Sequence, residues 1–152
     1  MHLNEGDSIL RCHDIFDYRN RLWIIIDLMD GCLTDVIDEL DAKYSENCVK
    51  YMCYKTLSGL QFLHERHIIH RDIKSDNVLY NEQGDVQLAD FGFAVQLTEQ
   101  KSARVTKVGT LHWMAPELIR GERKYSTSID IWSFGIFAYE LAMVEPPYAT
   151  AK

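Results

Sequence analysis

The chain has 152 residues, a size typical of one domain and too small for two substantial ones. Hydrophobic residues make up 47% of the chain and charged residues 26%, which excludes the disordered and low-complexity classes of protein. Acidic residues outnumber basic ones, 23 to 16, and the net charge of −7 predicts neither nucleic acid nor an anionic membrane surface as a partner.

The cysteines and the apolar runs bear on the location of the protein. Four cysteines stand at scattered positions without a CxxC pair, and the opening residues MHLNEGD lack the pattern of a signal peptide. We therefore expect reduced thiols and a cytoplasmic or nuclear location. The run from Leu22 to Ile26 is much shorter than the ~20 residues of a membrane-spanning helix, so no membrane span is expected.

The first predicted elements are a hairpin and a short helix. Ile9 to Tyr18 and Arg21 to Leu28 are apolar segments separated by the polar pair Arg19-Asn20, which predicts two paired strands. The run LWIIID in the second segment is typical of a strand buried on both faces. Residues Leu33 to Leu40 carry apolar side chains at helical spacing, which predicts a helix.

A longer helix follows. Ser45 is a suitable cap for a helix from Glu46 to Glu65. Its expected buried stripe consists of Val49, Met52, Cys53, Thr56, Leu57, Leu60 and Leu63.

The second half of the chain combines a hairpin, a long loop and an apolar helix. Val78 to Tyr80 and Val86 to Leu88 flank turn-forming residues and predict a second hairpin. The stretch from Asp90 to about Pro116 predicts a long irregular loop, and loops of this length are usually functional. The stretch from about Ser128 to Met143 predicts a helix that is apolar on nearly all sides, so we expect protein around it.

Three short motifs stand around the second hairpin. His70-Arg71-Asp72-Ile73-Lys74-Ser75-Asp76-Asn77 precedes it, Asp90-Phe91-Gly92 follows it, and Ala115-Pro116-Glu117 closes the long loop. In this order and context they resemble the eukaryotic protein kinases. The strings HRDIKSDN, DFGFA and GTLHWMAPE are similar to the serine/threonine kinases of the sterile-twenty group, most closely its PAK-like branch.

The resemblance extends from about Ile9 to Tyr148 and implies an α+β, protein-kinase-like fold that is only partly present. Residues 1–26 would be a remnant of the small lobe, 27–31 the hinge, and 32–152 an incomplete large lobe. The implied function is that of an ATP-dependent serine/threonine kinase core that uses Mg²⁺ and acts on proteins.

The resemblance also assigns roles at the catalytic centre. Asp72 would orient and deprotonate the substrate hydroxyl, and Lys74 would steady the γ-phosphate. Asn77 and Asp90 would hold Mg²⁺. Thr110 resembles the hydroxyl that joins the aspartate and the lysine in serine/threonine kinases.

Nucleotide contacts are implied in the same way. Ile26 falls at the gatekeeper position, and Asp27 to Met29 would be the hinge whose backbone meets adenine. Leu79 would lie beneath the adenine ring. Ile26 and Leu79 also fit a plain core role, and the two interpretations are compatible.

Regulation is implied by Arg71, which would grip a phosphorylated Thr106 in the long loop. The alternative for Thr106 is an unmodified, exposed threonine. Asp130, an acid on the apolar helix, resembles the family's anchor for the catalytic-loop backbone. His64, His67 and His70 recur every third residue, but the offsets of helical zinc motifs are absent, so no zinc site is expected.

The sequence departs from the kinase pattern at both ends. Gly6 is the only glycine before Asp27, and the first lysine is Lys43, so neither the glycine-rich loop nor the strand lysine is seen. Because positioning of the nucleotide is most of what a kinase contributes, we expect this chain alone to be inactive or nearly so. A non-catalytic kinase-like binding module or pseudokinase fragment is the alternative. Control by small GTPases, common among PAK-like kinases, would act through segments outside this chain.

Overall fold

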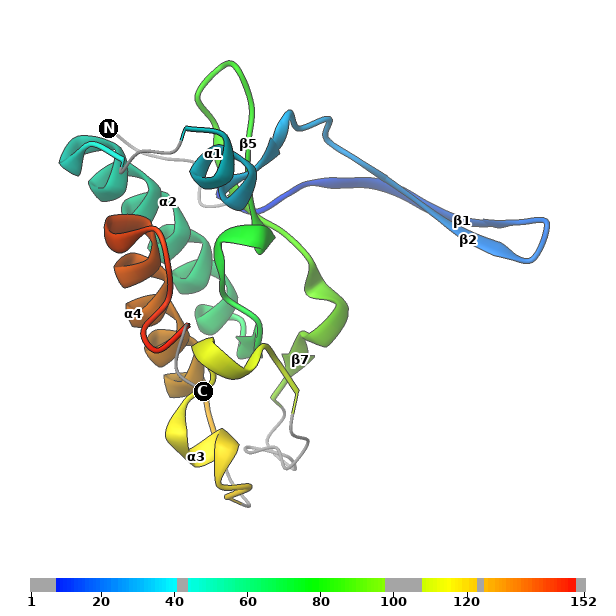
Figure 1. Ribbon diagram of the computed structural model, residues 1–152. Helices are drawn as coiled ribbons and strands as arrows, with labels where there is room; N and C mark the ends of the chain where they lie inside the picture. Colours follow the sequence, from blue (N-terminus) through cyan, green and yellow to red (C-terminus); the bar gives the residue numbers. More distant parts are fainter. Residues whose placement is uncertain (1–7, 41–43, 98–107, 123–124, 150–152) are drawn as a thin grey trace.

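A computed structural model describes residues 8–40, 44–97, 108–122 and 125–149 of the chain (Figure 1). Runs of short strands are followed by helices along the chain, and the strands form small antiparallel sheets, in agreement with the predicted α+β class. The elements are β1 (Cys12–Tyr18), β2 (Arg21–Ile26), β3 (Gly31–Cys32), α1 (Leu33–Leu40), α2 (Glu46–Glu65), β4 (Ile68–Ile69), β5 (Val78–Tyr80), β6 (Val86–Leu88), β7 (Val95–Gln96), α3 (Pro116–Ile119) and α4 (Ser128–Met143).

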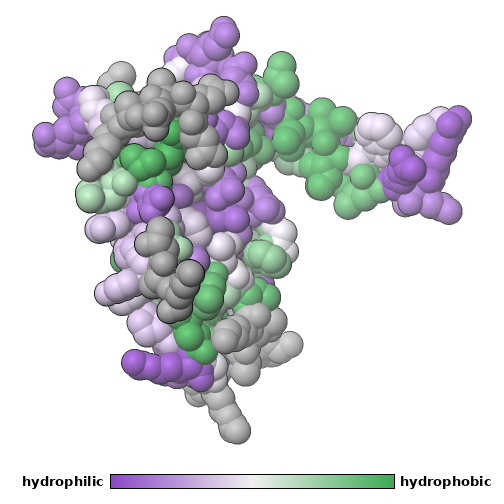
Figure 2. Space-filling model, in the orientation of Figure 1, coloured by the Kyte–Doolittle hydropathy of each residue, from purple (hydrophilic) through white to green (hydrophobic). Residues whose placement is uncertain are grey.

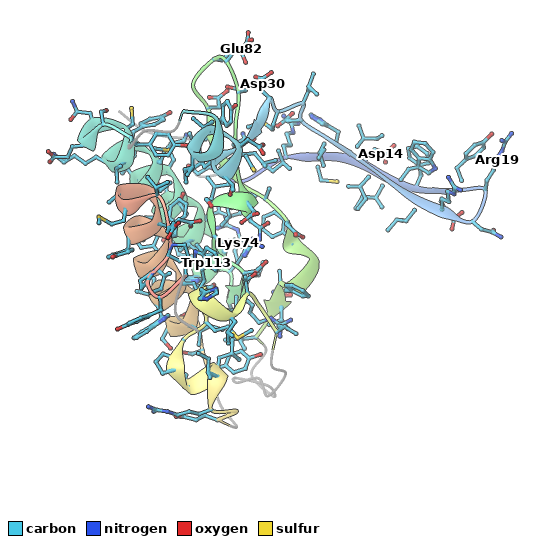
Figure 3. The ribbon with its side chains drawn as sticks, viewed as in Figure 1. Asp14, Arg19, Asp30, Lys74, Glu82 and Trp113 are labelled. Carbon is cyan, nitrogen blue, oxygen red and sulfur yellow. The ribbon has the colours of Figure 1, made fainter. Side chains whose placement is uncertain are left out.

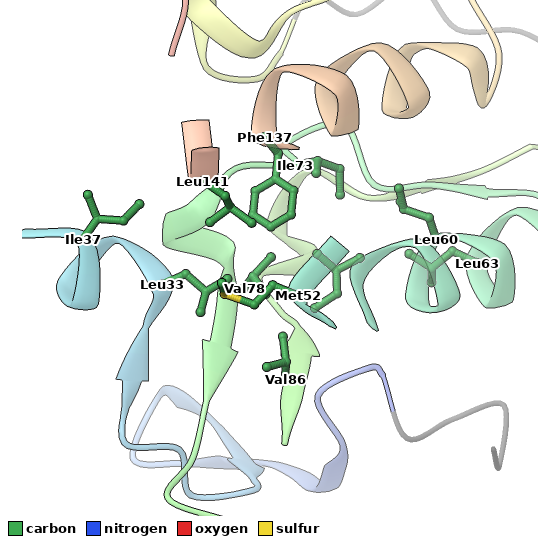
Figure 4. Close-up of a cluster of buried hydrophobic side chains, with 11 residues drawn as sticks. Leu33, Ile37, Met52, Leu60, Leu63, Ile73, Val78, Val86, Phe137 and Leu141 are labelled. Carbon is green, nitrogen blue, oxygen red and sulfur yellow. The ribbon is translucent and has the colours of Figure 1, made fainter. Parts of the chain in front are cut away.

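The core lies where α2 and α4 pack side by side and β5 and β6 cover them (Figure 1). Figure 4 shows its buried side chains, which come from all of these elements and from α1. They include Leu33, Ile37, Met52, Leu60, Leu63, Ile73, Val78, Val86, Leu88, Phe137 and Leu141. Ile73 lies in the loop before β5, so burial of this side chain ties the loop to the core.

Helix α2 begins as predicted. Ser45 is in an extended conformation, and its hydroxyl accepts a hydrogen bond from the backbone N–H of Cys48 at 3.3 Å. The predicted stripe is correct for Met52, Thr56, Leu60 and Leu63, which are buried. Leu57 was wrongly included, since its side chain is 45% exposed. It lies one residue beyond Thr56, where the helix has already turned away from the core.

The second hairpin is confirmed and belongs to a sheet of three strands in the order β3-β5-β6. Cys32 pairs with Leu79, and Leu79 pairs with Gln87. The residues just before β1 lie along β6, because Leu10 donates its N–H to Leu88 at 2.9 Å and Leu88 donates to Ser8 at 2.8 Å. The first predicted strand therefore begins at Cys12, three residues later than Ile9, which pairs with Leu88 instead.

Strands β1 and β2 form an arm that extends from the body (Figure 1). The prediction that the second strand is buried on both faces was wrong: every residue of β2 is exposed, and Ile24 is 54% exposed. The arm packs mainly on itself, with the Phe16 and Trp23 rings stacked 6.4 Å apart. Figure 2 shows that the half of the arm nearest the body is apolar and its tip is hydrophilic.

The long loop is less irregular than the sequence predicts. β7 pairs with β4, and Leu97 donates its N–H to the carbonyl of His67 at 2.7 Å. The single helical turn α3 begins at Pro116. Proline is well tolerated at the first position of a helix, because the N–H group that it lacks would have no acceptor within the helix. The β4–β7 pairing thus joins the start of the loop to the body.

Helix α4 was expected to be surrounded by protein. Ile129, Phe137 and Leu141 are fully buried, but Ile131 is 50% exposed and Trp132 is 46% exposed. Within the described residues, α4 is therefore covered on one side only.

In the described parts of the chain, no helix combines the length and the apolar character needed to cross a membrane.

The close approach of α2 to Ser8 predicts that position 59 of the chain must be glycine. A Cβ atom on Gly59 would lie 2.8 Å from the carbonyl oxygen of Ser8, whereas a Cβ on Gly135 in α4 would meet nothing within 4 Å. We expect Gly59→Ala to lower the free energy of unfolding by about 1–3 kcal/mol. The control Gly135→Ala should be neutral or stabilising by up to about 1 kcal/mol, because alanine favours helix. Urea unfolding followed by circular dichroism measures both, and equal effects would contradict the prediction.

Candidate active site

The loop between β4 and β5 is held in place by one buried acid on α4. Asp130 on α4 is fully buried. One carboxylate oxygen accepts the backbone N–H of Arg71 and the other that of His70, both at 2.8 Å. The second oxygen also lies 2.9 Å from His64 Nε2. The position of Asp130 agrees with the expected anchor of the catalytic-loop backbone.

His70 is also fully buried and adds a second constraint. Its Nδ1 accepts the backbone N–H of Asp72 at 3.3 Å, so the proton resides on Nε2, which donates to the carbonyl of Ala89 at 2.8 Å. Burial lowers the pKa of His70, in keeping with a neutral ring that accepts at one nitrogen and donates at the other. The ring of Phe91 packs edge-on against it, with the ring centres 5.3 Å apart.

Asp72 lies at the centre of the loop with its side chain 6% exposed. Its Oδ1 accepts two hydrogen bonds from Thr110, from the backbone N–H at 2.9 Å and from the hydroxyl at 2.8 Å. Its Oδ2 accepts one from Asn77 Nδ2 at 2.9 Å and lies 3.9 Å from the ammonium of Lys74. The four residues predicted to be catalytic, Asp72, Lys74, Asn77 and Thr110, are therefore brought together.

Gly109 brings Thr110 within reach of Asp72. Its φ of 121° lies in a region that side chains disfavour, and a Cβ there would lie 2.6 Å from the carbonyl oxygen of Arg71. Only glycine permits this approach of the long loop to the loop between β4 and β5.

Asp90 follows β6 and is placed beside the loop by the backbone. Ala89 donates its N–H to the carbonyl of Asn77 at 2.9 Å, so the next residue emerges at the same edge. Asp90 has a left-handed backbone conformation with φ of 56°, and its side chain accepts from the N–H of Gly92 at 3.1 Å. Its carboxylate is exposed.

The residues present fit Mg²⁺. Asn77 uses its Nδ2 on the backbone and side-chain oxygens of Asp72, which leaves the amide oxygen as its ligand atom, and Asp90 adds an exposed carboxylate. Mg²⁺ prefers such oxygen ligands and usually completes its coordination with water and phosphate oxygens. Among the described residues, no three His, Cys, Asp or Glu side chains gather around one point, but a site with two protein ligands does not require this.

The residues predicted to contact the nucleotide lie in two places. Leu79 lies on β5 in the body, whereas Ile26 lies at the end of β2 on the arm. Asp30 donates its N–H to the carbonyl of Tyr80 at 2.9 Å and Cys32 pairs with Leu79, so the segment after Met29 runs beside Leu79. Ile26 is 47% exposed on the arm. The Asp27 carboxylate pairs with His13 at 2.6 Å, and its N–H donates to the carbonyl of Arg11.

Arg71 has a left-handed conformation with φ of 73° and points toward the long loop. Its Nε donates to the carbonyl of Phe93 at 2.5 Å, and Nη1 donates to the Tyr125 hydroxyl at 3.1 Å. Thr106, the predicted phosphorylation site, lies outside the described residues.

The histidines that recur every third residue have different side-chain partners. His64 Nε2 contacts the carboxylate of Asp130, whereas His70 Nε2 donates to the carbonyl of Ala89.

One buried acid near the site was not predicted from the sequence. Glu140 is 5% exposed on α4 and accepts hydrogen bonds from Ser75 and Trp113. The signal was the same as for Asp130, an acid on an otherwise apolar helix.

Comparison with known proteins agrees with this geometry. The model of the protein kinase domain family matches residues 1–152, and the chain belongs to this family. It is 49% identical over 146 residues to the serine/threonine-protein kinase pakB of Dictyostelium discoideum, which covers 91% of the chain and 17% of the relative.

Two further relatives carry similar names. Identity to the serine/threonine-protein kinase CLA4 of Candida albicans is 48% over 130 residues, with 85% of the chain and 13% of the relative covered. Identity to pakC of Dictyostelium discoideum is 47% over 151 residues, with 97% and 31% covered. The predicted PAK-like resemblance is confirmed, and the chain spans less than a third of the length of these relatives.

Replacement of one carboxylate oxygen of Asp130 should destabilise the loop between β4 and β5, because a backbone N–H group of that loop loses its acceptor. Asp130→Asn turns one of two acceptors into a donor that faces an N–H group, and we expect it to lower the free energy of unfolding by about 2–4 kcal/mol. Asp17→Asn on the exposed arm is the control and should change stability by less than about 0.5 kcal/mol. Chemical denaturation compares the two, and wild-type stability of Asp130→Asn would refute the anchor role.

Proposed function

We propose that this chain is the catalytic core of a PAK-like serine/threonine kinase that transfers the γ-phosphate of ATP to hydroxyl groups of proteins. The supporting observation is the arrangement around Asp72, whose carboxylate is held by Thr110 and Asn77 with Lys74 beside it. Kinases, in which positioning and electrostatics supply most of the catalysis, need such a fixed acceptor.

The two oxygens of Asp72 differ in what they can still accept. The two hydrogen bonds from Thr110 occupy both lone pairs of Oδ1, while Oδ2 accepts one hydrogen bond from the described part of the chain, that of Asn77. Oδ2 is therefore the oxygen that would accept the proton of a substrate hydroxyl. Lys74, near the same oxygen, would place its positive charge next to the transferred phosphoryl group.

Asn77 and Asp90 would hold Mg²⁺ through oxygen atoms at the edge shared by the catalytic loop and β6. The bound metal supplies positive charge that stabilises the phosphates during transfer. The backbone of Asp27 and Met29 would contact adenine, with Ile26 and Leu79 lining the ring. In this division residues 1–26 belong to the small lobe, 27–31 to the hinge and 32–152 to the large lobe.

The expectation that the 152-residue chain alone transfers little phosphate stays a prediction. It is supported by the exposed apolar side chains of Ile26, at the end of β2, and Leu28, just after it, which are 47% and 92% exposed. These residues would leave a bound nucleotide open to water, which weakens electrostatic stabilisation.

Substitution of Asp72 tests the proposed function. In the full-length protein, we expect Asp72→Asn to lower the rate of phosphate transfer from ATP to a serine-containing protein about 10²–10⁴-fold, as loss of a general base does. Asp85→Asn, in the exposed turn of the second hairpin, is the control and should retain activity. Radiolabelled ATP and phosphoamino-acid analysis measure transfer to serine and threonine. Undiminished transfer by Asp72→Asn would rule out the assigned role, and no transfer by the wild type would favour the binding-module alternative.

Regulation would run through Arg71 and Thr106. Phe93 and Tyr125 hold the guanidinium of Arg71 at the foot of the long loop, and a guanidinium binds phosphate through paired hydrogen bonds. A phosphate on Thr106 would thus order the loop that carries Thr110.

Thr106→Ala in the full-length protein should lower kcat/KM for a protein substrate about tenfold or more, because the charge-assisted bonds to Arg71 are lost. Thr98→Ala, in the same loop, is the matched control and should have no such effect. Mass spectrometry of the wild type should find phosphate on Thr106. Full activity of protein without that phosphate would contradict this regulation.

The location and partners follow from the same proposal. Four free cysteines favour a reducing cytoplasm. The substrates would be proteins with accessible serine or threonine, and control by a small GTPase would act through segments beyond this chain.

A further inference from the structure

His13 on β1 makes a side-chain contact that none of the roles above uses. Its Nε2 lies 2.6 Å from Oδ1 of Asp27, the residue that follows β2. Because an ionised carboxylate only accepts hydrogen bonds, the proton lies on Nε2 and the imidazole donates. The side chain of His13 is 42% exposed and that of Asp27 is 35% exposed, so the pair lies at the surface.

A β-bulge directs His13 toward this acid. In the pairing of the two described strands, Cys12 lies opposite Ile26 and Asp14 lies opposite Ile25, so His13 is an extra residue on β1. Side chains alternate between the two faces of a regular strand, and an extra residue changes the direction in which a side chain points. The bulge thus accounts for the position of the imidazole beside the residue that ends the hairpin.

The backbone of Asp27 is held by the same part of the chain. Its N–H donates to the carbonyl of Arg11 at 3.2 Å, and its carboxylate accepts from His13. The N–H and the carboxylate of Asp27 are therefore both used by residues at the start of the arm. The backbone carbonyl of Asp27 is the polar group that is left, and it belongs to the part of the hinge that is proposed to contact adenine.

The other end of the hinge is held by the body of the protein. Asp30 donates its N–H to the carbonyl of Tyr80 at 2.9 Å, and its Oδ2 accepts the N–H of Glu82 at 2.7 Å. Figure 3 shows Asp30 and Glu82 close together near the turn of the β5–β6 hairpin. Leu28, between the two ends of the hinge, is 92% exposed and contributes little to packing. The conformation of this short segment therefore depends on how its ends are held.

We propose that His13 is a positioning residue for the nucleotide: through Asp27 it fixes the first end of the hinge, so that the backbone from Asp27 to Met29 is arranged for adenine before ATP binds. This inference rests on the proposed function. A segment that is already fixed loses less conformational freedom when a ligand binds, and the affinity for the ligand is higher as a result. In this role His13 acts through Asp27 and not by contact with the nucleotide.

The first test measures KM values in the full-length protein. His13→Ala removes the donor, and we expect it to raise the KM for ATP about threefold, an effect of the size that a partly exposed ion pair supports. The KM for a serine-containing peptide should change by less than about 1.5-fold. His13→Gln keeps an N–H donor and should restore most of the affinity for ATP. The matched control is Asp14→Asn, which keeps the oxygen that accepts the N–H of Ile15 and should change neither KM.

The second test asks whether His13 acts through Asp27. Asp27→Ala removes the acceptor and keeps the backbone, so it should raise the KM for ATP by about the same factor as His13→Ala. Because both substitutions break one contact, the double variant should show the effect of a single one. Effects that multiply in the double variant, or a KM for ATP that does not rise in His13→Ala, would overturn the proposal.

A third readout depends on neither nucleotide nor activity. Hydrogen exchange of the full-length protein, followed by mass spectrometry of peptides that cover residues 22–31, reports how often the hinge opens. We expect His13→Ala to speed exchange in this segment about threefold, because one of the contacts that hold Asp27 is lost. His13→Gln and Asp14→Asn should match the wild type. Unchanged exchange in His13→Ala would show that the hinge is fixed without His13, which contradicts the proposal.

These readouts separate failure of this proposal from failure of the proposed function. A wild-type protein that transfers no phosphate would overturn the proposed function, and hydrogen exchange of the hinge would still decide whether His13 fixes this segment. An active protein whose KM for ATP is the same in the wild type and in His13→Ala would keep the proposed function and refute the positioning role of His13.

Discussion

Two backbone N–H groups, those of His70 and Arg71, point at the fully buried carboxylate of Asp130, and the rest of the site depends on this contact. Backbone groups in a buried loop need partners, and here a side chain of α4 provides them. The loop is thereby set against a helix that contributes fully buried side chains to the core. His70 is held in one tautomer between Asp72 and Ala89, and its two hydrogen bonds fix the loop relative to the end of β6.

Helix α4 therefore serves as a support for polar contacts as well as for the core. Asp130, Ser133 and Glu140 all lie on it, and each bonds to a segment that carries or adjoins the residues proposed to be catalytic. The apolar side chains of α4 exclude water from these bonds, which makes each of them stronger than it would be at the surface. An apolar helix with a few acids can thus order loops that have little regular structure of their own.

Much of this arrangement could be predicted from the sequence because the signals were local. Apolar spacing indicated α1, α2 and α4, turn residues indicated the second hairpin, and the motif residues Asp72, Asn77 and Asp90 lie together as their order implied. Asp130 could be predicted because a lone acid on an apolar helix needs a partner. Glu140 carries the same signal, and its partners are Ser75 and Trp113.

Other features depend on contacts that no local pattern reports. The run LWIIID has the composition of a buried strand, but burial is decided by what lies against a strand, and β2 lies on an extended arm. The pairing of β4 with β7 involves two residues on each side, too few to produce a period. The partners of Trp113 and Tyr125 are distant in sequence, so only the folded chain shows them.

The arm has a further consequence for the behaviour of this stretch of chain in solution. Among the described residues, β1 and β2 pair only with each other, so each strand keeps one edge of unpaired backbone groups beside exposed isoleucines. Such an edge is a template for strand addition by another copy. The charged tip, with Asp17, Arg19 and Arg21, opposes stacking at the far end only, and self-association should begin at the apolar half of the arm.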